Sequence, residues 1–134
     1  MRCYGEPASE LSGGLDSTSI CAIAAQELHN TNIHAYCHAM SQPSSKATSR
    51  EQDEFALSQL LANNYPNIQL QKVTSENVGF LDTLEQTVRS HSGPNNRDFS
   101  TMGSQILIDM QKQNQKSLLS GFGGEQVVTG FWVG

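Results

Sequence analysis

Short apolar runs alternate along the chain with longer segments of helical periodicity. The runs have the apolar or alternating pattern of buried strands and cover residues 7–11, 33–40, 68–73 and 117–119. The segments between them repeat their apolar positions at helical spacing and predict helices at residues 17–29, 49–62, 78–89 and 101–114. Because strands alternate with helices, the pattern predicts an α/β fold, a Rossmann-like parallel sheet with helices on both faces.

Local signals refine this outline. The first helix is expected to pack through one apolar face made by Ile20, Ile23, Ala24 and Leu28. Ser49 and Gln52 form a capping box that predicts the start of the second helix. Glycine-rich segments, residues 12–14 and 120–124, follow the first and the last strand. Ligands of parallel sheets bind beyond the carboxyl ends of the strands, so we expect the ligand site at these two loops.

Length and charge narrow the classes of function. The chain has 134 residues, which suits one domain over residues 1–134. Its net charge of −5 argues against a nucleic acid as partner. No apolar run approaches the roughly 20 residues of a membrane span, and the N-terminus lacks the apolar region of a secretion signal. Because no apolar run is long enough to span a membrane, we expect no membrane partner. The three cysteines are odd in number and lack metal-ligand spacing, so we expect a reducing, cytoplasmic environment.

The loop at residues 12–17 has the composition of an anion-binding loop. Gly13 and Gly14 let backbone N–H groups approach a phosphate, and the following helix adds its free N–H groups and positive dipole end. Ser12 and Ser17 add hydroxyl donors. Asp16 would repel a phosphate unless a cation such as Mg²⁺ lay between them. A plain tight turn, with Asp16 as a helix cap, remains the alternative.

Both loops resemble motifs of one family. Residues 10–18, Glu-Leu-Ser-Gly-Gly-Leu-Asp-Ser-Thr, resemble the pyrophosphate-binding loop (PP-loop) of the N-type ATP pyrophosphatases, whose fold is adenine nucleotide alpha hydrolase-like. Within that superfamily they look most like the synthetase domain of asparagine synthetase and its β-lactam synthetase and lasso-peptide cyclase relatives. Residues 118–130 resemble the second motif of the same family.

The resemblance implies a carbon–nitrogen ligase that uses ATP and Mg²⁺. A substrate carboxylate becomes an acyl-adenylate, pyrophosphate is released, and an amine or ammonia then forms the amide. Matched position by position, the nucleotide-binding residues are Leu11, Ser12, Gly13, Gly14, Asp16, Ser17, Met40, Ser120 and Gly121. The acids implied to hold Mg²⁺ are Asp16 and Glu125.

Three departures from the family pattern bear on the substrate and on activity. Phe122 replaces a family acid implicated in amidation, which argues against aspartate as the substrate. Glu125 stands where the family has Asp, with one more methylene of reach. The family's catalytic lysine lies beyond the second loop, so no catalytic residue is assigned. We therefore expect residues 1–134 to be the ATP-binding core of a larger ligase, inactive without its C-terminal helical part, with a glutaminase domain as a further possible partner.

Two other functions remain open at this point. A degenerate module that binds ATP without chemistry would fit Phe122 and the absent lysine. A tRNA-modifying N-type ATP pyrophosphatase would share the first loop, but the net charge of −5 and the second loop count against it. A metal site built from the four histidines is disfavoured because His34 and His38 have no evident third ligand.

Overall fold

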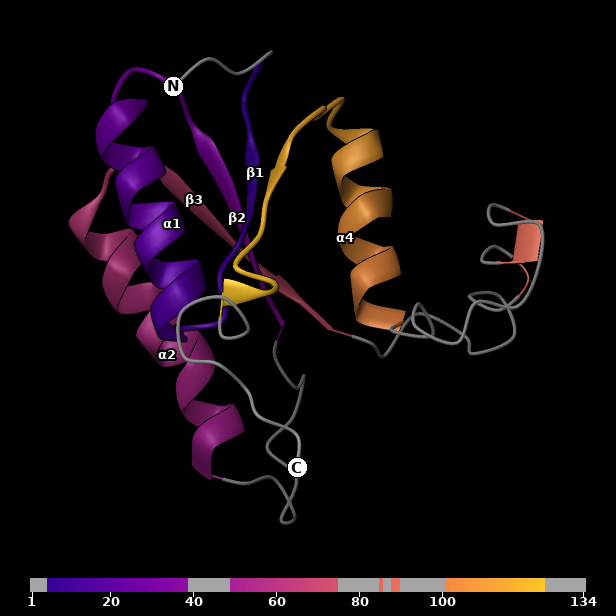
Figure 1. The fold of residues 1–134 in the computed structure, drawn as a ribbon, viewed down its shortest axis with the longest axis horizontal. Coiled ribbons are helices and arrows are strands. Elements are labelled where there is room, and N and C mark those ends of the chain that lie inside the picture. The colour runs from indigo at the N-terminus through magenta and orange to yellow at the C-terminus, as the bar shows by residue number, and fades with distance from the viewer. Residues whose placement is uncertain (1–4, 39–48, 75–84, 86–87, 90–100, 125–134) are drawn as a thin grey trace.

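The computed structural model describes residues 5–38, 49–74, 85, 88–89 and 101–124 (Figure 1). Its framework is a parallel sheet of four strands in the order β3-β2-β1-β4. The strands are β1 (Ala8–Glu10), β2 (Ile33–His38), β3 (Ile68–Val73) and β4 (Leu118–Leu119). Each strand pairs in parallel with its neighbours, with Ala8 opposite His34 on one side and Leu118 on the other. The predicted α/β parallel sheet is therefore confirmed.

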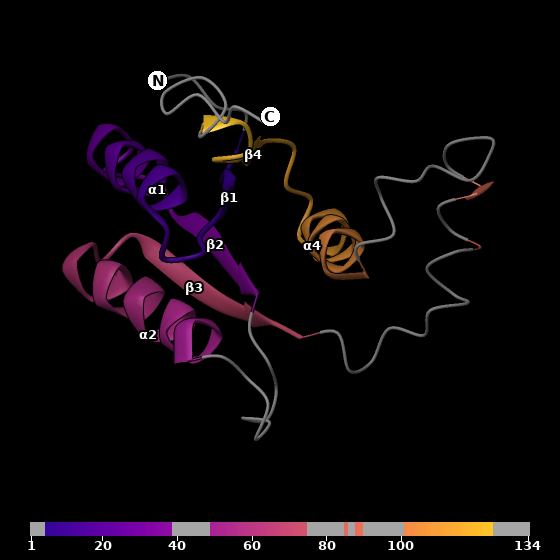
Figure 2. The ribbon, with the colours of Figure 1, turned by 60° about the horizontal axis from the view of Figure 1, so that its bottom comes forward.

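Helices cover both faces of the sheet, as predicted (Figure 2). Helices α1 (Leu15–Glu27) and α2 (Ser49–Asn64) lie on one face, and α4 (Thr101–Lys112) lies on the other. The α1/α2 side buries a core of Leu11, Cys21, Ala24, Ala25, Ile33, Ala35 and Ile68. The α4 side buries Ala8, Tyr36, Val73, Ile106 and Met110. The sheet therefore lies between two hydrophobic cores, one on each face.

The face predicted for α1 is wrong in part. Ile23 is 60% exposed, whereas Cys21 and Ala25 are buried against the sheet. Small side chains on this face let the helix approach the strands closely, and this contact outweighs the burial of one larger apolar residue. The error concerns which face packs; the helix itself begins two residues earlier than predicted, at Leu15.

Most other predicted elements agree with the structure to within a few residues. Helix α2 begins at Ser49, as its capping box predicts. The strand predicted over residues 33–40 is observed to His38, and its last two residues lie outside the described part. Of the helix predicted over residues 78–89, the described residues are Glu85, Val88 and Arg89, and these are helical. In the part of the chain that the structure describes, no helix is both long and apolar enough to cross a bilayer.

The strand order changes direction at β1. The chain moves from β1 through β2 to β3 on one side and returns to β4 on the other side of β1. Such a switch point leaves a crevice at the carboxyl ends of the two strands, because the connections leave in opposite directions. The two glycine-rich loops follow β1 and β4, so the topology brings both to this crevice.

Candidate functional site

Four hydrogen bonds hold the first loop in one shape. The Ser12 N–H donates to Ser17 Oγ at 3.1 Å, and the two serine hydroxyls are 3.0 Å apart. Ser17 Oγ also donates to the carbonyl of Gly14 at 3.3 Å, and the Gly14 N–H donates to Ser12 Oγ at 3.3 Å. Ser17 is buried and its hydroxyl is used inside the loop. Its hydroxyl thus fixes the loop, which gives Ser17 a supporting position in the site.

Gly13 places the loop directly on helix α2. Its φ of +73° lies in the left-handed region, which favours glycine. A β-carbon at this position would come within 2.9 Å of Leu57 Cβ and 3.0 Å of the Glu54 carbonyl oxygen. Residue 13 must therefore be glycine both for its backbone conformation and for its packing.

The loop leads into a helix start with free donors. Gly14 is the N-cap of α1 and provides no side-chain cap. The first turn of any helix has N–H groups without partners inside the helix, and its positive dipole end attracts anions. Asp16 lies in this first turn. The loop and the helix start together therefore form a candidate anion site with one carboxylate at its edge.

The second loop is tied to β1 through a serine. Ser120 Oγ donates to a carboxylate oxygen of Glu10, and the Phe122 N–H donates to Ser120 Oγ at 3.1 Å. The Gly124 N–H donates to the Gly121 carbonyl at 3.1 Å and closes a turn. These bonds fix the path of the loop backbone on both sides of Phe122.

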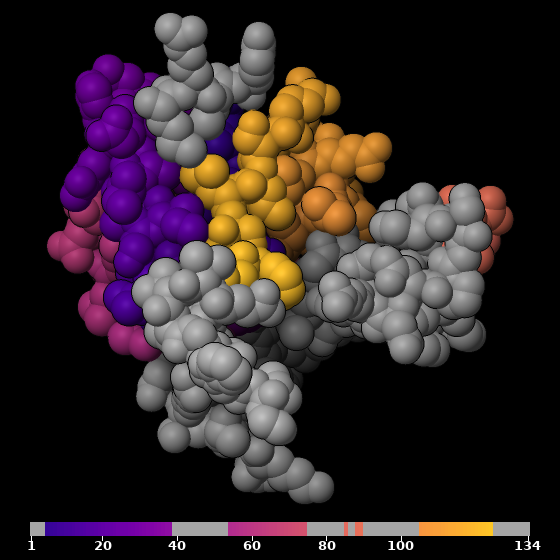
Figure 3. All heavy atoms as spheres, in the orientation of Figure 1, coloured from indigo at the N-terminus to yellow at the C-terminus, as the bar shows by residue number. Residues whose placement is uncertain are grey.

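The two loops pack against each other closely enough that two glycines are needed. A β-carbon at Gly121 would lie 2.8 Å from the backbone nitrogen of Ser17, and one at Gly124 would lie 2.6 Å from Asp16 Oδ2. The segment that includes this loop lies at the surface between α1 and α4, in yellow in Figure 3. The glycines thus bring the second loop to the anion site and to the Asp16 carboxylate.

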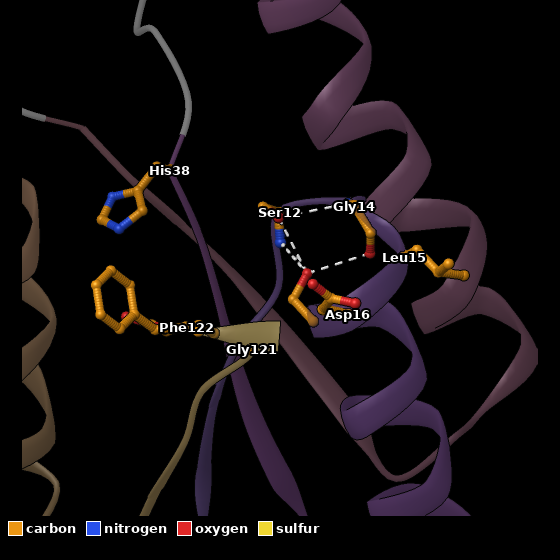
Figure 4. A pocket seen from close by; sticks show the side chains of 10 residues that line it. Ser12, Gly14, Leu15, Asp16, His38, Gly121 and Phe122 are labelled. Carbon is orange, nitrogen blue, oxygen red and sulfur yellow. Dashed lines mark hydrogen bonds between the residues drawn. The ribbon is translucent and has the colours of Figure 1, made fainter. Parts of the chain in front are cut away.

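A pocket of about 390 Å³ opens between the loops (Figure 4). Ser12, Gly14 and Asp16 lie at one end, and the rings of His38 and Phe122 lie at the other. The remaining lining residues are Glu10, Leu15, Ser17, Gly121 and Gly123. The pocket therefore joins the end formed by Ser12, Gly14 and Asp16, the anion-binding end, to an end with two aromatic rings.

The titratable groups of the pocket are two carboxylates and one imidazole. Burial lowers the pKa of His38, and the nearby carboxylates of Glu10 and Glu54 oppose that shift only in part. His38 Nδ1 is buried and has no hydrogen-bond partner among the described residues. His38 is therefore neutral at pH 7, and the residues that line the pocket include no lysine or arginine.

The chemistry of Asp16 fits Mg²⁺ bound together with phosphates. Its carboxylate lies beside the backbone of Gly124 and faces the anion-binding end of the pocket. No group of three or more His, Cys, Asp or Glu that could hold a metal is found among the described residues. Mg²⁺ is commonly held by one or two carboxylates plus substrate phosphates, which is the donor set that this end of the pocket could offer with a nucleotide bound.

The structure brings most of the predicted site residues together. Five of them line the pocket: Ser12, Gly14, Asp16, Ser17 and Gly121. Gly13 packs the first loop against α2, and Ser120 accepts a hydrogen bond from the Phe122 N–H within the second loop. Leu11 is 1% exposed and uses its N–H and carbonyl within the protein, bonded to Tyr36 and Ser58. Met40 and Glu125 lie outside the described residues.

Two pocket residues were missed by reasoning from the sequence. Glu10 is the last residue of β1, and His38 is the last residue of β2. Their position was the available signal, because the final residue of a parallel strand lies at the edge where ligands bind. Glu10 opens the motif at residues 10–18 and His38 was weighed only as a metal ligand, so neither was assigned to the nucleotide site.

Of the comparisons with known proteins, the family model identifies the type of domain. The family model described as "Asparagine synthase" matches residues 1–132. No curated protein matches the chain. Among solved structures, a universal stress protein in complex with cAMP is 14% identical, with 89% of this chain and 97% of that chain covered and a TM-score of 0.39.

Proposed function

The chain belongs to the asparagine synthase family, and from that premise we propose that it binds Mg·ATP between its two loops for amide-bond synthesis through an acyl-adenylate. The observation that supports this proposal most directly is the contact of the two loops at the strand-order switch. Gly121 meets Ser17, and Gly124 meets Asp16. One loop alone would be an ordinary turn before a helix. Two loops around one pocket form a site with room for phosphates and a second substrate.

The phosphates bind at the anion-binding end. The N–H groups at the start of α1 and the Ser12 hydroxyl donate to phosphate oxygens, and the glycines keep side chains out of their way. Asp16 and Glu125, which follows Gly124 in the sequence, would hold Mg²⁺. When bound, the metal ion offsets the negative charge of the phosphates. Helix α2 supports the loop from behind through its contact with Gly13.

The reaction has two steps. A carboxylate oxygen of the substrate attacks the α-phosphorus, the bond from the α-phosphorus to the bridging oxygen breaks, and pyrophosphate leaves. An amine nitrogen then attacks the acyl carbon, AMP leaves, and the nitrogen loses its proton. The first loop contributes by orienting the phosphates so that the α-phosphorus faces the pocket. Orientation of this kind lowers a reaction barrier because the reactants no longer lose their freedom of motion in the reacting step.

The test separates a ligase site from a module that binds nucleotide without chemistry. Calorimetry measures the binding of Mg·ATP, and release of pyrophosphate is followed with a panel of carboxylic acids that includes aspartate. Acid-dependent release supports the ligase site. Binding without release with any acid favours an incomplete or a degenerate module, since residues 1–134 are expected to be inactive without a C-terminal helical part. Absence of Mg·ATP binding rejects the proposed function.

A further inference from the structure

The end of the pocket opposite the anion-binding loop has a surface that phosphate binding does not use. Phe122 is 92% exposed, and its ring lines the pocket together with the imidazole of His38. Figure 4 shows both rings at the end away from Ser12, Gly14 and Asp16. An exposed phenyl ring in a pocket wall favours a ligand that covers it, because that contact removes apolar surface from water.

The exposed position of Phe122 is held by specific contacts. Its N–H is bonded to Ser120 Oγ, which is bonded in turn to Glu10 at the end of β1. Gly123, which follows it, has a φ of +88°, so the chain turns sharply just after the ring. The side chain therefore extends from a backbone fixed on both sides.

The charges of the described residues around this wall disfavour an acidic ligand group. Glu10 and Asp16 are the charged side chains among the residues that line the pocket, and both are acids. His38 adds no positive charge at neutral pH, because burial lowers its pKa. A second carboxylate on the substrate would meet the like charge of Glu10 there, and no lysine or arginine is among the described residues that line the pocket.

We propose that His38 and Phe122 form the recognition surface for the carboxylic acid substrate, and that it selects an acid with an uncharged apolar or aromatic side chain over a dicarboxylic acid. This inference rests on the proposed function, since the acid is the group that the nucleotide activates. Glu10 is a positioning residue in this arrangement, because it holds Ser120 and through it Phe122.

The test uses three stable adenosine compounds on the full chain. They are 5′-O-sulfamoyladenosine without an acyl group, its N-phenylacetyl derivative, and its N-succinyl derivative, which carries a free carboxylate. Calorimetry is expected to give about tenfold tighter binding for the phenylacetyl than for the succinyl compound. Phe122→Ala is expected to remove that preference, with a larger loss of affinity for the phenylacetyl compound than for the unacylated one. Phe122→Leu retains part of it, and Leu107→Ala, at an exposed position on α4, retains all of it.

Three results contradict the inference in different ways. Equal affinity for the two acylated compounds rejects the selection of an apolar acid. An equal loss of affinity for all three compounds in Phe122→Ala assigns the rings to the adenine base and overturns the assignment to the acid. Failure of Mg·ATP and all three compounds to bind rejects the proposed function, and the inference with it.

Discussion

Three glycines allow the packing of the first loop on α2 to be measured in separate parts. At Gly5 the backbone has a φ of +76°, but an added β-carbon would meet nothing within 4 Å. At Gly13 the φ is +73° and the β-carbon would also meet Leu57 Cβ at 2.9 Å. At Gly14 the φ is −74°, and the β-carbon would meet only the Ser12 hydroxyl at 3.3 Å. Alanine therefore tests backbone strain alone at Gly5 and strain with a clash at Gly13. At Gly14 it tests only a tight contact with the Ser12 hydroxyl, without backbone strain.

The expected magnitudes follow from these contacts. Left-handed backbone costs an alanine about 1–2 kcal/mol, which is the expected loss for Gly5→Ala. The clash at Gly13 adds about 1–3 kcal/mol, so Gly13→Ala loses about 2–5 kcal/mol in total. Gly14→Ala loses about 1 kcal/mol or less, because alanine is a poorer N-cap than glycine. For a chain of this size, each kcal/mol corresponds to about 4 °C in Tm.

Urea unfolding followed by circular dichroism measures the three free energies of unfolding under one condition. A shared slope with denaturant is required for the comparison, since a changed slope means a changed unfolded or native state. If Gly13→Ala costs no more than Gly5→Ala, the loop does not rest on Leu57 and Glu54 as described. The support of the phosphate loop by α2 would then have to be abandoned.

Three further predictions concern other buried polar groups. Asn67→Ala lowers the free energy of unfolding by about 1–3 kcal/mol, because the Asn67 amide donates to three carbonyls at the end of α1. Asn67→Asp also loses the donor, so its free energy of unfolding in the same urea assay should be no higher than that of Asn67→Ala. Tyr36→Phe costs about 1–2 kcal/mol, since the buried Gln115 oxygen loses its donor at 3.0 Å, and an unchanged midpoint would contradict that. In the folded state the pKa of His38 is lowered from 6.5, so as the pH falls the unfolded state binds a proton before the folded state does. The stability contributed by neutral His38 is therefore complete above pH 6.5 and is lost as the pH falls toward the folded pKa. NMR titration of the His38 ring should therefore give a midpoint below 6.5, lower still in Glu10→Gln, and a midpoint at or above 6.5 would refute the burial argument.

Reasoning from the sequence predicted the fold well because the fold depends on repeated local patterns. The alternation of strands and helices, and the glycines after β1 and β4, are visible in the residue order. The packing face of α1 was harder to predict. Cys21 and Ala25 are weak apolar signals, yet they pack on the sheet while Ile23 remains exposed. Close approach of a helix to a sheet depends on the shapes of both partners, which a helical repeat does not contain.

The candidate site was predictable to the extent that it lies within motifs. Ser12, Gly14 and Asp16 were found from the chemistry of an anion-binding loop and lie together in the pocket. Glu10 and His38 were not found, because their role comes from the parallel register that places both at one edge of the sheet. The contact of the two loops through Gly121 likewise depends on the three-dimensional fold, because it joins segments that are distant in the sequence.

The central claim is that the pocket between the two loops binds Mg·ATP, with Asp16 as a metal ligand. The most direct measurement is calorimetry of ATP with the wild type and Asp16→Asn, each in Mg²⁺ and in EDTA. In Mg²⁺ the substitution is expected to weaken binding by about tenfold or more, because the metal ion loses a charged ligand. In EDTA it is expected to leave binding unchanged or tighter, since a charge that repels phosphate is removed. The same affinity for both proteins in Mg²⁺, or an equal loss with and without the metal ion, would contradict the account.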